Sequence, residues 1–242
     1  DTFNISTVSA IVVAAAGVRV AKHGNRAASS RSGSADVLEA LGVRIDLDAE
    51  QVARCVREVG IGFLFAPQHH AALRHAGPVR RELGLRTFFN LLGPLASPAS
   101  ASHQVLGVYD PTRVRQLAEV LRLLGVTAAW VVHGDGGIDE VSTSGPTQVA
   151  MLANGDIREA VLTPADFGLD AVPLAALVGG DAAENASIAR AVLAGEPGAR
   201  RTAVLMNAGA SLCVTGLAST PREAAQKAGE LIDSGAALAK LD

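Results

Sequence analysis

The chain has 242 residues, of which 49% are apolar, 3% aromatic and 19% charged, and its formal net charge is −3. The length fits one large globular α/β domain, and the low aromatic content predicts an aliphatic core. The negative net charge argues against a protein that wraps nucleic acid. No apolar run reaches 18 residues, which argues against a membrane span, and Cys55 and Cys213 are expected to be buried, reduced thiols of a cytoplasmic protein.

The first third of the chain shows alternating helical and extended patterns. Residues 8–17 are apolar nearly all round, which predicts a buried helix, and a short strand is expected at 18–22. Further helices are predicted at 35–41 and directly after Asp48, a residue type that caps helix N-termini. The continuous apolar run at 61–65 is typical of a strand that is buried on both faces.

The middle of the chain repeats this alternation. Strands are predicted at 104–109 and 128–133, and Asp110-Pro111 favours the start of a helix between them. Asn154-Gly155 separates two strand-like runs, at 148–153 and 157–162, and this pair of residues is typical of a tight hairpin turn.

The last third is predicted to be helical, at 185–194, 203–214 and 221–241. Strands that alternate with helices of this length predict an α/β fold, with a largely parallel central sheet, helices on both of its faces and an antiparallel edge. We treat residues 1–242 as one domain.

Four segments carry residues suited to chemistry, and the first lies at the start of the chain. Asn4, Ser6 and Thr7 precede the predicted helix at 8–17. Such residues are common helix caps. The free N–H groups at a helix start and the helix dipole also favour a bound phosphate.

The second segment follows the predicted strand at 18–22. Lys22, His23, Gly24, Asn25 and Arg26 lead into a loop with four serines at positions 29, 30, 32 and 34. A polar glycine loop between a strand and a helix has the form of a phosphate cradle, although neither the Walker A nor the dinucleotide glycine spacing is present. A solvated loop is the alternative interpretation.

The third segment contains Arg80, Arg81 and Arg86, followed by a run of apolar residues that ends in Gly93-Pro94. A guanidinium group pairs a planar carboxylate through two hydrogen bonds, so this segment suits carboxylate recognition. A basic, solvated helix face that ends at a turn is the alternative.

The fourth segment places Asp139 and Glu140 shortly after the predicted strand at 128–133. Ligands of open α/β sheets bind outside the carboxyl ends of the strands, and a pair of carboxylates there can hold Mg²⁺ together with substrate phosphates. An acidic surface turn is equally consistent with these residues alone.

Taken in order, these motifs resemble the anthranilate phosphoribosyltransferase family. The resemblance covers almost the whole chain and rests on an ordered set of motifs: Asn-Ile-Ser-Thr, Lys-His-Gly-Asn-Arg, Ser-Gly-Ser-Ala-Asp-Val-Leu-Glu-Ala-Leu-Gly, Arg-Thr-x-Phe-Asn-x-Leu-Gly-Pro-Leu, Val-His-Gly, Asp-Glu and Gly-Gly-Asp-Ala. It implies a nucleoside phosphorylase/phosphoribosyltransferase-like fold. The implied reaction transfers the 5-phosphoribosyl group from phosphoribosyl pyrophosphate to the amine of anthranilate and releases pyrophosphate, in tryptophan biosynthesis.

The resemblance also implies a role for each matched residue. Phosphoribosyl pyrophosphate would be bound by Asn4, Ser6, Thr7, Lys22 and Ser30. Anthranilate would be bound by His23, Asn25 and Arg80, and two Mg²⁺ ions by Ser6, Asp139 and Glu140. No residue is assigned as a general acid or base, and no covalent enzyme intermediate is expected.

The family's members have an N-terminal helical domain and a glycine-rich loop, and both are expected to be missing from this stretch of sequence. Residues 67–86 are expected to pack against that helical domain, and the whole protein is expected to be a homodimer. Two alternatives rank lower. A pyrimidine-nucleoside phosphorylase-like enzyme would lack the long motif that ends in Leu-Gly-Pro-Leu, and a non-catalytic, nucleic-acid-binding homologue would lack the Asp139-Glu140 pair.

Overall fold

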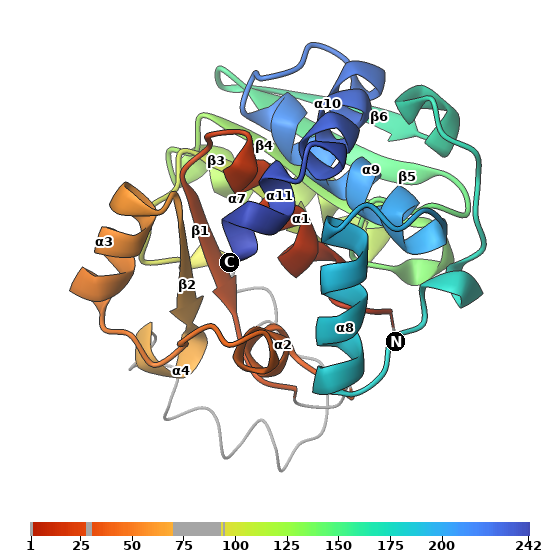
Figure 1. Cartoon of the computed structure of the whole chain (residues 1–242). Coiled ribbons are helices and arrows are strands. Elements are labelled where there is room, and N and C mark those ends of the chain that lie inside the picture. Colours follow the sequence, from red (N-terminus) through yellow and green to blue (C-terminus); the bar gives the residue numbers. More distant parts are fainter. Residues whose placement is uncertain (1, 28–30, 70–92, 94) are drawn as a thin grey trace.

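The computed structural model describes residues 2–27, 31–69, 93 and 95–242 (Figure 1). The strands in this part of the chain are β1 (Val20–Gly24), β2 (Ile61–Phe65), β3 (His103–Gly107), β4 (Ala128–Gly134), β5 (Thr147–Ala153) and β6 (Asp156–Leu162). The α-helices are α1 (Ile5–Ala15), α2 (Ser34–Ala40), α3 (Ala49–Glu58), α4 (Ala66–His69), α7 (Val114–Leu123), α8 (Ala182–Leu193), α9 (Ala199–Val214), α10 (Pro221–Asp233) and α11 (Ala236–Leu241). The 3₁₀ turns of the described residues are η2 (Pro111–Arg113), η3 (Asp135–Gly137), η4 (Pro164–Phe167) and η5 (Leu174–Leu177).

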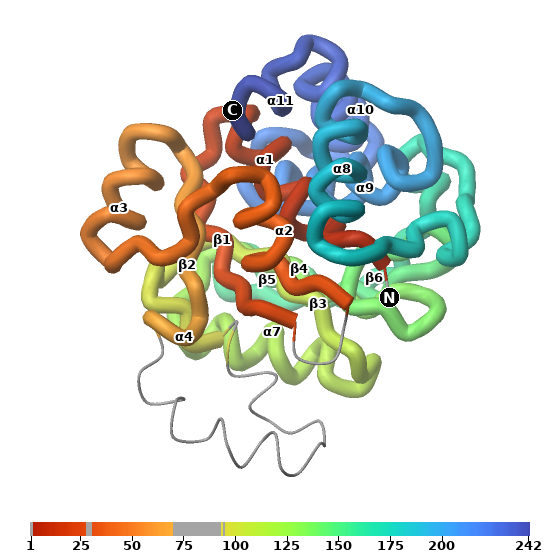
Figure 2. Tube along the Cα trace, turned by 60° about the horizontal axis from the view of Figure 1, so that its bottom comes forward, coloured from red at the N-terminus to blue at the C-terminus, as the bar shows by residue number. Residues whose placement is uncertain are grey.

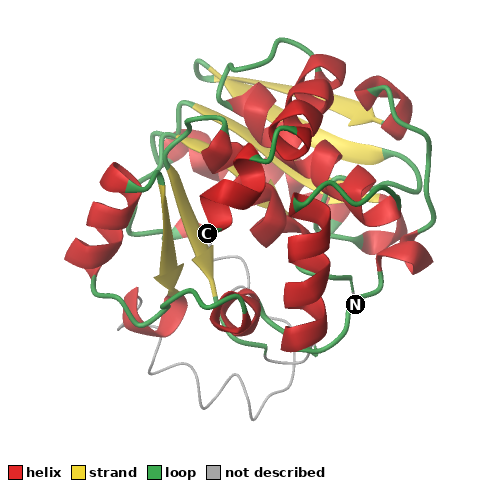
Figure 3. Cartoon of the chain, in the orientation of Figure 1, coloured by secondary structure: helices red, strands yellow, loops and turns green. Residues whose placement is uncertain are grey.

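The described strands form two sheets, one of two strands and one of four, and Figure 3 shows them as separate groups of arrows. β1 and β2 pair in parallel. The second sheet has the order β3-β4-β5-β6, in which β3 and β4 are parallel and the other two pairings are antiparallel. The α/β class and the antiparallel edge are therefore confirmed. The strands nevertheless differ from the single, largely parallel sheet of the prediction, because periodicity identifies strands but not the edges along which they pair.

Helices cover both faces of the four-stranded sheet, as predicted. α7 packs against β4, β5 and β6 on one side, and α9 packs against β3 and β4 on the other. Figure 2 shows α7 on the opposite side of these strands from α1, α8, α9 and α10. In the two-stranded sheet, α1 contacts β1 and α3 contacts β2. α1 also packs against α9, so one helical layer connects the two sheets.

The core is aliphatic, as the composition predicts. The larger hydrophobic cluster contains side chains of α1, α2, α8, α9 and α10. It includes the fully buried Val12, Met206 and Leu212. A smaller cluster lies beneath α7, where Leu117 and Leu121 meet the sheet. Burial of such side chains contributes about 25 cal/mol of stability per Å² of apolar surface. The two hydrophobic clusters therefore stabilise the packing of the helices on the sheets.

Several helix ends follow from local sequence. Asp48 accepts a hydrogen bond from the N–H of Gln51 at 2.9 Å, which confirms it as the cap of α3. The helix predicted at 221–241 is wrong as one element, because α10 ends at Asp233 and α11 begins at Ala236. Gly235 lies between them with φ = 77°, a left-handed conformation that ends a helix and that glycine adopts without strain.

The prediction of buried thiols is also wrong. Cys55 and Cys213 are free, and both are partly exposed. On α3 only Val52 is buried, because this helix covers β2 with a single narrow face. No helix of the described residues is both long and apolar enough to cross a membrane. Of the segment 67–86, only residues 67–69 fall within the described part, so its predicted packing stays a prediction.

Candidate active site

A cavity of about 1030 Å³ contains most of the predicted site residues that the structure describes. Its lining includes Ser6 from α1, Lys22 and His23 from β1, and Asp139 and Glu140 from the segment that follows β4. These residues come from segments more than 100 positions apart in the sequence. The fold therefore brings together the hydroxyl, the amine and the two carboxylates that the motifs singled out.

The N-terminus of α1 meets the carboxylate pair directly. The backbone N–H of Ser6, in the first turn of α1, lies close enough to the Glu140 carboxyl to lower its pKa. Such N–H groups have no partner within their own helix and favour anionic groups. Thr7, one position on, is buried, and its hydroxyl has no hydrogen-bond partner among the residues that the structure describes. Asn4 precedes the helix, and its Nδ2 donates to the carbonyl of Ser32 at 3.4 Å.

The carboxylates and Lys22 form one electrostatic group. The pKa of Glu140 is raised to about 8, first by burial and then by the neighbouring charge of Asp139, while Lys22 and the Ser6 N–H act in the opposite direction. Burial lowers the pKa of Lys22, and the charges of Glu140 and Asp139 counteract that effect. The Lys22 Nζ donates to the carbonyl of His23 at 3.1 Å. A desolvated carboxylate, Glu140, and an exposed one, Asp139, thus lie near one amine, an arrangement that favours a bound cation or a phosphate with its counter-ion.

The turn that carries the carboxylates lies against two glycines. A Cβ atom at Gly107, the last residue of β3, would overlap the carbonyl oxygen of Asp139. A Cβ atom at Gly134, the last residue of β4, would lie 2.5 Å from the carbonyl oxygen of Glu140. Both strands therefore need a residue without a side chain where the turn crosses their ends.

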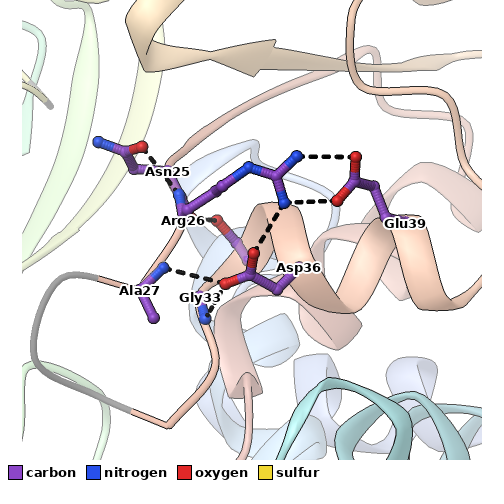
Figure 4. Close-up of polar contacts among 7 residues, drawn as sticks. Asn25, Arg26, Ala27, Gly33, Asp36 and Glu39 are labelled. Carbon is purple, nitrogen blue, oxygen red and sulfur yellow. Dashed lines mark hydrogen bonds and ion pairs between the residues drawn. The ribbon is translucent and has the colours of Figure 1, made fainter.

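The loop after β1 is folded onto α2 by one ion-paired arginine (Figure 4). The guanidinium of Arg26 donates to Asp36 at 2.9 Å and to both carboxylate oxygens of Glu39. It also lies 5.7 Å from the ring centroid of Phe65 at the end of β2. The acidic residues of α2 therefore pair with the charge of Arg26 and hold its side chain against that helix.

Asp36 closes the same loop from the helix side. Its Oδ2 accepts hydrogen bonds from the N–H of Ala27 at 3.0 Å and of Gly33 at 2.9 Å, the two residues that flank the loop in the described chain (Figure 4). Partial burial alone would raise the pKa of Asp36, but these two donors and Arg26 lower it below its usual value. The carboxylate thus fixes the base of the loop.

The remaining predicted residues are placed differently. Asn25 is exposed, its Oδ1 accepts from the N–H of Arg26 at 2.8 Å, and it is absent from the cavity lining. Asn4 and Thr7 also lie outside that lining, although Thr7 directly follows Ser6 and Asn4 is two positions before it. Ser30 and Arg80 lie outside the described residues, so their predicted roles stay predictions.

The donor set suits a hard divalent cation that also binds substrate. The described residues contain no group of three or more His, Cys, Asp or Glu side chains placed to hold a metal ion. Asp139, Glu140 and the Ser6 hydroxyl are oxygen donors, and Mg²⁺ in proteins binds one or two carboxylates and completes its shell with water and phosphate oxygens. These residues therefore fit Mg²⁺ with a phosphorylated ligand.

Sequence comparison gives the family. Residues 1–238 match the model of the glycosyl transferase family, a/b domain. The anthranilate phosphoribosyltransferase of Azorhizobium caulinodans is 54% identical over 241 residues, which cover 100% of this chain and 70% of the relative. That of Myxococcus xanthus is 56% identical over 241 residues, covering 99% and 71%. The chain belongs to the anthranilate phosphoribosyltransferase family.

Solved structures of anthranilate phosphoribosyltransferases share the fold. The crystal structure from Thermus thermophilus superposes with a TM-score of 0.93 at 48% identity and covers 99% of this chain and 71% of that one. The Saccharomyces cerevisiae protein in complex with PRPP and Mg gives a TM-score of 0.90 at 32% identity, over 99% of this chain and 68% of that one. This membership confirms the phosphoribosyltransferase-like fold class and favours the family over the nucleoside phosphorylase and nucleic-acid-binding alternatives.

Proposed function

We propose that the protein transfers the 5-phosphoribosyl group of phosphoribosyl pyrophosphate to the amine of anthranilate and releases pyrophosphate, in tryptophan biosynthesis. The observation that carries this proposal is the meeting of Ser6, Lys22, Asp139 and Glu140 in one cavity. Family membership supports the same reaction, since relatives that are 54% and 56% identical are anthranilate phosphoribosyltransferases. The chain 1–242 is proposed to act as one catalytic α/β domain.

In this proposal, Asp139, Glu140 and the Ser6 hydroxyl hold magnesium, with two ions per site. A magnesium ion held by these residues would supply positive charge to offset the negative charge that develops on the leaving pyrophosphate. Lys22 adds a fixed positive charge on the same side, and the start of α1 contributes N–H donors beside Asn4 and Thr7. A yeast relative has been solved in complex with PRPP and Mg, which supports this assignment.

Anthranilate is proposed to bind beside His23, with Asn25 and Arg80 as further ligands. His23 lines the cavity next to Lys22, so an amine held there would lie close to the phosphoribosyl site. The yeast relative has also been solved in complex with 4-fluoroanthranilate. The amine of anthranilate is a weak nucleophile, because its lone pair is delocalised into the ring. Positioning of this amine against an oxocarbenium-like sugar carbon is therefore the main contribution of these residues, without a covalent enzyme intermediate.

We further propose a homodimer in the cytoplasm. The free, partly exposed thiols of Cys55 and Cys213 suit a reducing compartment.

The test is the loss of anthranilate fluorescence when the purified protein is mixed with phosphoribosyl pyrophosphate and Mg²⁺. Asp139→Asn and Glu140→Gln are each expected to reduce kcat/KM by roughly a hundredfold or more. Asp170→Asn, at an exposed aspartate remote from the cavity lining, is the matched control and is expected to keep full activity. A folded wild-type protein that consumes no anthranilate, or carboxylate variants with undiminished turnover, would overturn the proposal.

A further inference from the structure

A buried amide holds the residue that follows the carboxylate pair. The Oδ1 of Asn207, on α9, accepts a hydrogen bond from the N–H of Val141 at 2.8 Å. Its Nδ2 donates to the carbonyl of Val141 at 3.1 Å and to the carbonyl of Ala203 at 2.9 Å. One side chain thus satisfies both backbone groups of Val141 and is itself fixed to its own helix.

The bonds are made away from water. Asn207 is 4% exposed and Val141 is 1% exposed. Hydrogen bonds in such an environment are stronger than in water, and an unpaired polar group there is unfavourable. The backbone of Val141 therefore has one strongly preferred position relative to α9, and the peptide that joins it to Glu140 shares that constraint.

The same helix also orients the other side of the site. α9 packs against α1, which contributes Ser6 to the cavity. Asn207 itself lines the cavity together with Ser6 and Glu140. Because Gly107 and Gly134 let the turn lie against the strand ends, the turn is confined by β3 and β4 and by α9.

We propose that Asn207 is a positioning residue for the metal-binding carboxylates Asp139 and Glu140. It does not touch the reacting atoms, and it acts by fixing Val141 so that both carboxylates face the cavity. Residues that orient metal ligands in this way change metal affinity or activity by about 10- to 100-fold when they are replaced. The inference rests on the proposed Mg²⁺-dependent transfer. It extends that proposal by giving a positioning role to Asn207, a residue that none of the four motifs contains.

The test compares three variants of the full protein. Asn207→Leu removes all three hydrogen bonds while keeping a similar side-chain volume. Asn207→Ser shortens the side chain so that it no longer reaches Val141, and it leaves room for a water molecule there. Met206→Ala is the matched control, since Met206 is the adjacent, fully buried residue of α9 and belongs to the hydrophobic core. Circular dichroism checks folding, Mn²⁺ binding is measured by electron paramagnetic resonance with pyrophosphate present, and the Mg²⁺ dependence of turnover is measured separately.

Both Asn207 variants are expected to weaken Mn²⁺ binding and to raise the half-saturating Mg²⁺ concentration about tenfold or more, whereas Met206→Ala keeps both values. If Asn207→Leu does not fold, Asn207→Ser decides the question. Wild-type metal affinity in a folded Asn207 variant, or an equal loss in Met206→Ala, would overturn the inference. A wild-type protein that binds Mn²⁺ in an Asn207-dependent way but does not consume anthranilate would leave the inference standing and overturn the proposed function.

Discussion

Asn185 donates from its Nδ2 to the Oδ1 of Asn4 at 3.0 Å, and so connects α8 to the start of α1 across 181 positions of sequence. The Oδ1 of Asn185 accepts the N–H of Gly180 at 2.8 Å, and Asn4 in turn donates to the carbonyl of Ser32. A chain of amides thus links the C-terminal half to the loop after β1. The N-terminus of α1, where phosphate binding is proposed, is therefore oriented by residues that are distant from it in the sequence.

Asn185→Ala is expected to destabilise the protein by about 1–3 kcal/mol and to weaken the binding of phosphoribosyl pyrophosphate. The buried N–H of Gly180 and the amide of Asn4 both lose their partner, and unsatisfied buried groups carry a penalty of this size. Urea denaturation measures the first effect and calorimetric titration the second. Ser187→Ala, on the exposed face of α8, is the control and should change stability by less than about 0.5 kcal/mol. Equal stability of the two variants would contradict the role of the amide chain.

Gly107→Ala is expected to displace the Asp139-Glu140 turn. The added methyl group would overlap the carbonyl of Asp139, so the turn must shift, with a loss of about 1–3 kcal/mol in stability and a higher Mg²⁺ requirement. Gly229→Ala provides the contrast, because the nearest atoms to its new Cβ lie 3.7 and 3.8 Å away and the residue is inside α10. Alanine there should stabilise the helix by up to about 1 kcal/mol. Urea denaturation and Mg²⁺ titration of turnover distinguish the two glycines, and a neutral Gly107→Ala would show that the turn adapts.

Local signals were sufficient for most elements of the fold. Asp48 caps α3, and Asn154-Gly155 turns the hairpin between β5 and β6, because these side chains act within a few residues of their own position. Contacts between distant segments could not be predicted in this way. The loop motif does not reveal that Arg26 pairs with Asp36 and Glu39 of α2, and the bonds from Asn207 to Val141 span 66 positions. The motifs identified the carboxylates, whereas their support comes from tertiary packing.

The stability of the loop after β1 is expected to depend on acid pH through Asp36. Hydrogen bonds from Ala27, Gly33 and Arg26 depress the folded-state pKa of this carboxyl against the opposing effect of its partial burial. A carboxyl with a depressed pKa stabilises the folded state at pH values above its unfolded-state pKa, which is about 3.9 for aspartate. This stabilisation is lost as the pH falls through the folded-state pKa. The free energy of unfolding of the wild type should exceed that of Asp36→Asn by about 1–2 kcal/mol at pH 7. The difference should shrink below about pH 4.

Urea denaturation between pH 2.5 and pH 7 measures this difference, the pH range being chosen around the value of about 3.9 for a free aspartate. Asp170→Asn, which removes one exposed negative charge, controls for the change in net charge. A stability difference between wild type and Asp36→Asn that stays constant over this range would show that the carboxylate charge contributes nothing to the loop.

Cys213 is expected to react slowly with alkylating reagents at pH 8. The pKa of its thiol is raised to about 11, first by burial and then by the charge of Glu223. Only about one thiol in a thousand is then ionised at pH 8, and the thiolate is the reactive form. The rate of iodoacetamide labelling, followed by peptide mass spectrometry, should rise about tenfold per pH unit between pH 8 and pH 10. Glu223→Gln removes the negative charge that helps to raise the pKa of Cys213, so the labelling rate should increase at each pH. Labelling of Cys213 at the rate of a free cysteine peptide at pH 8 would show that the site is open to solvent and ionised, contrary to its packing on α9.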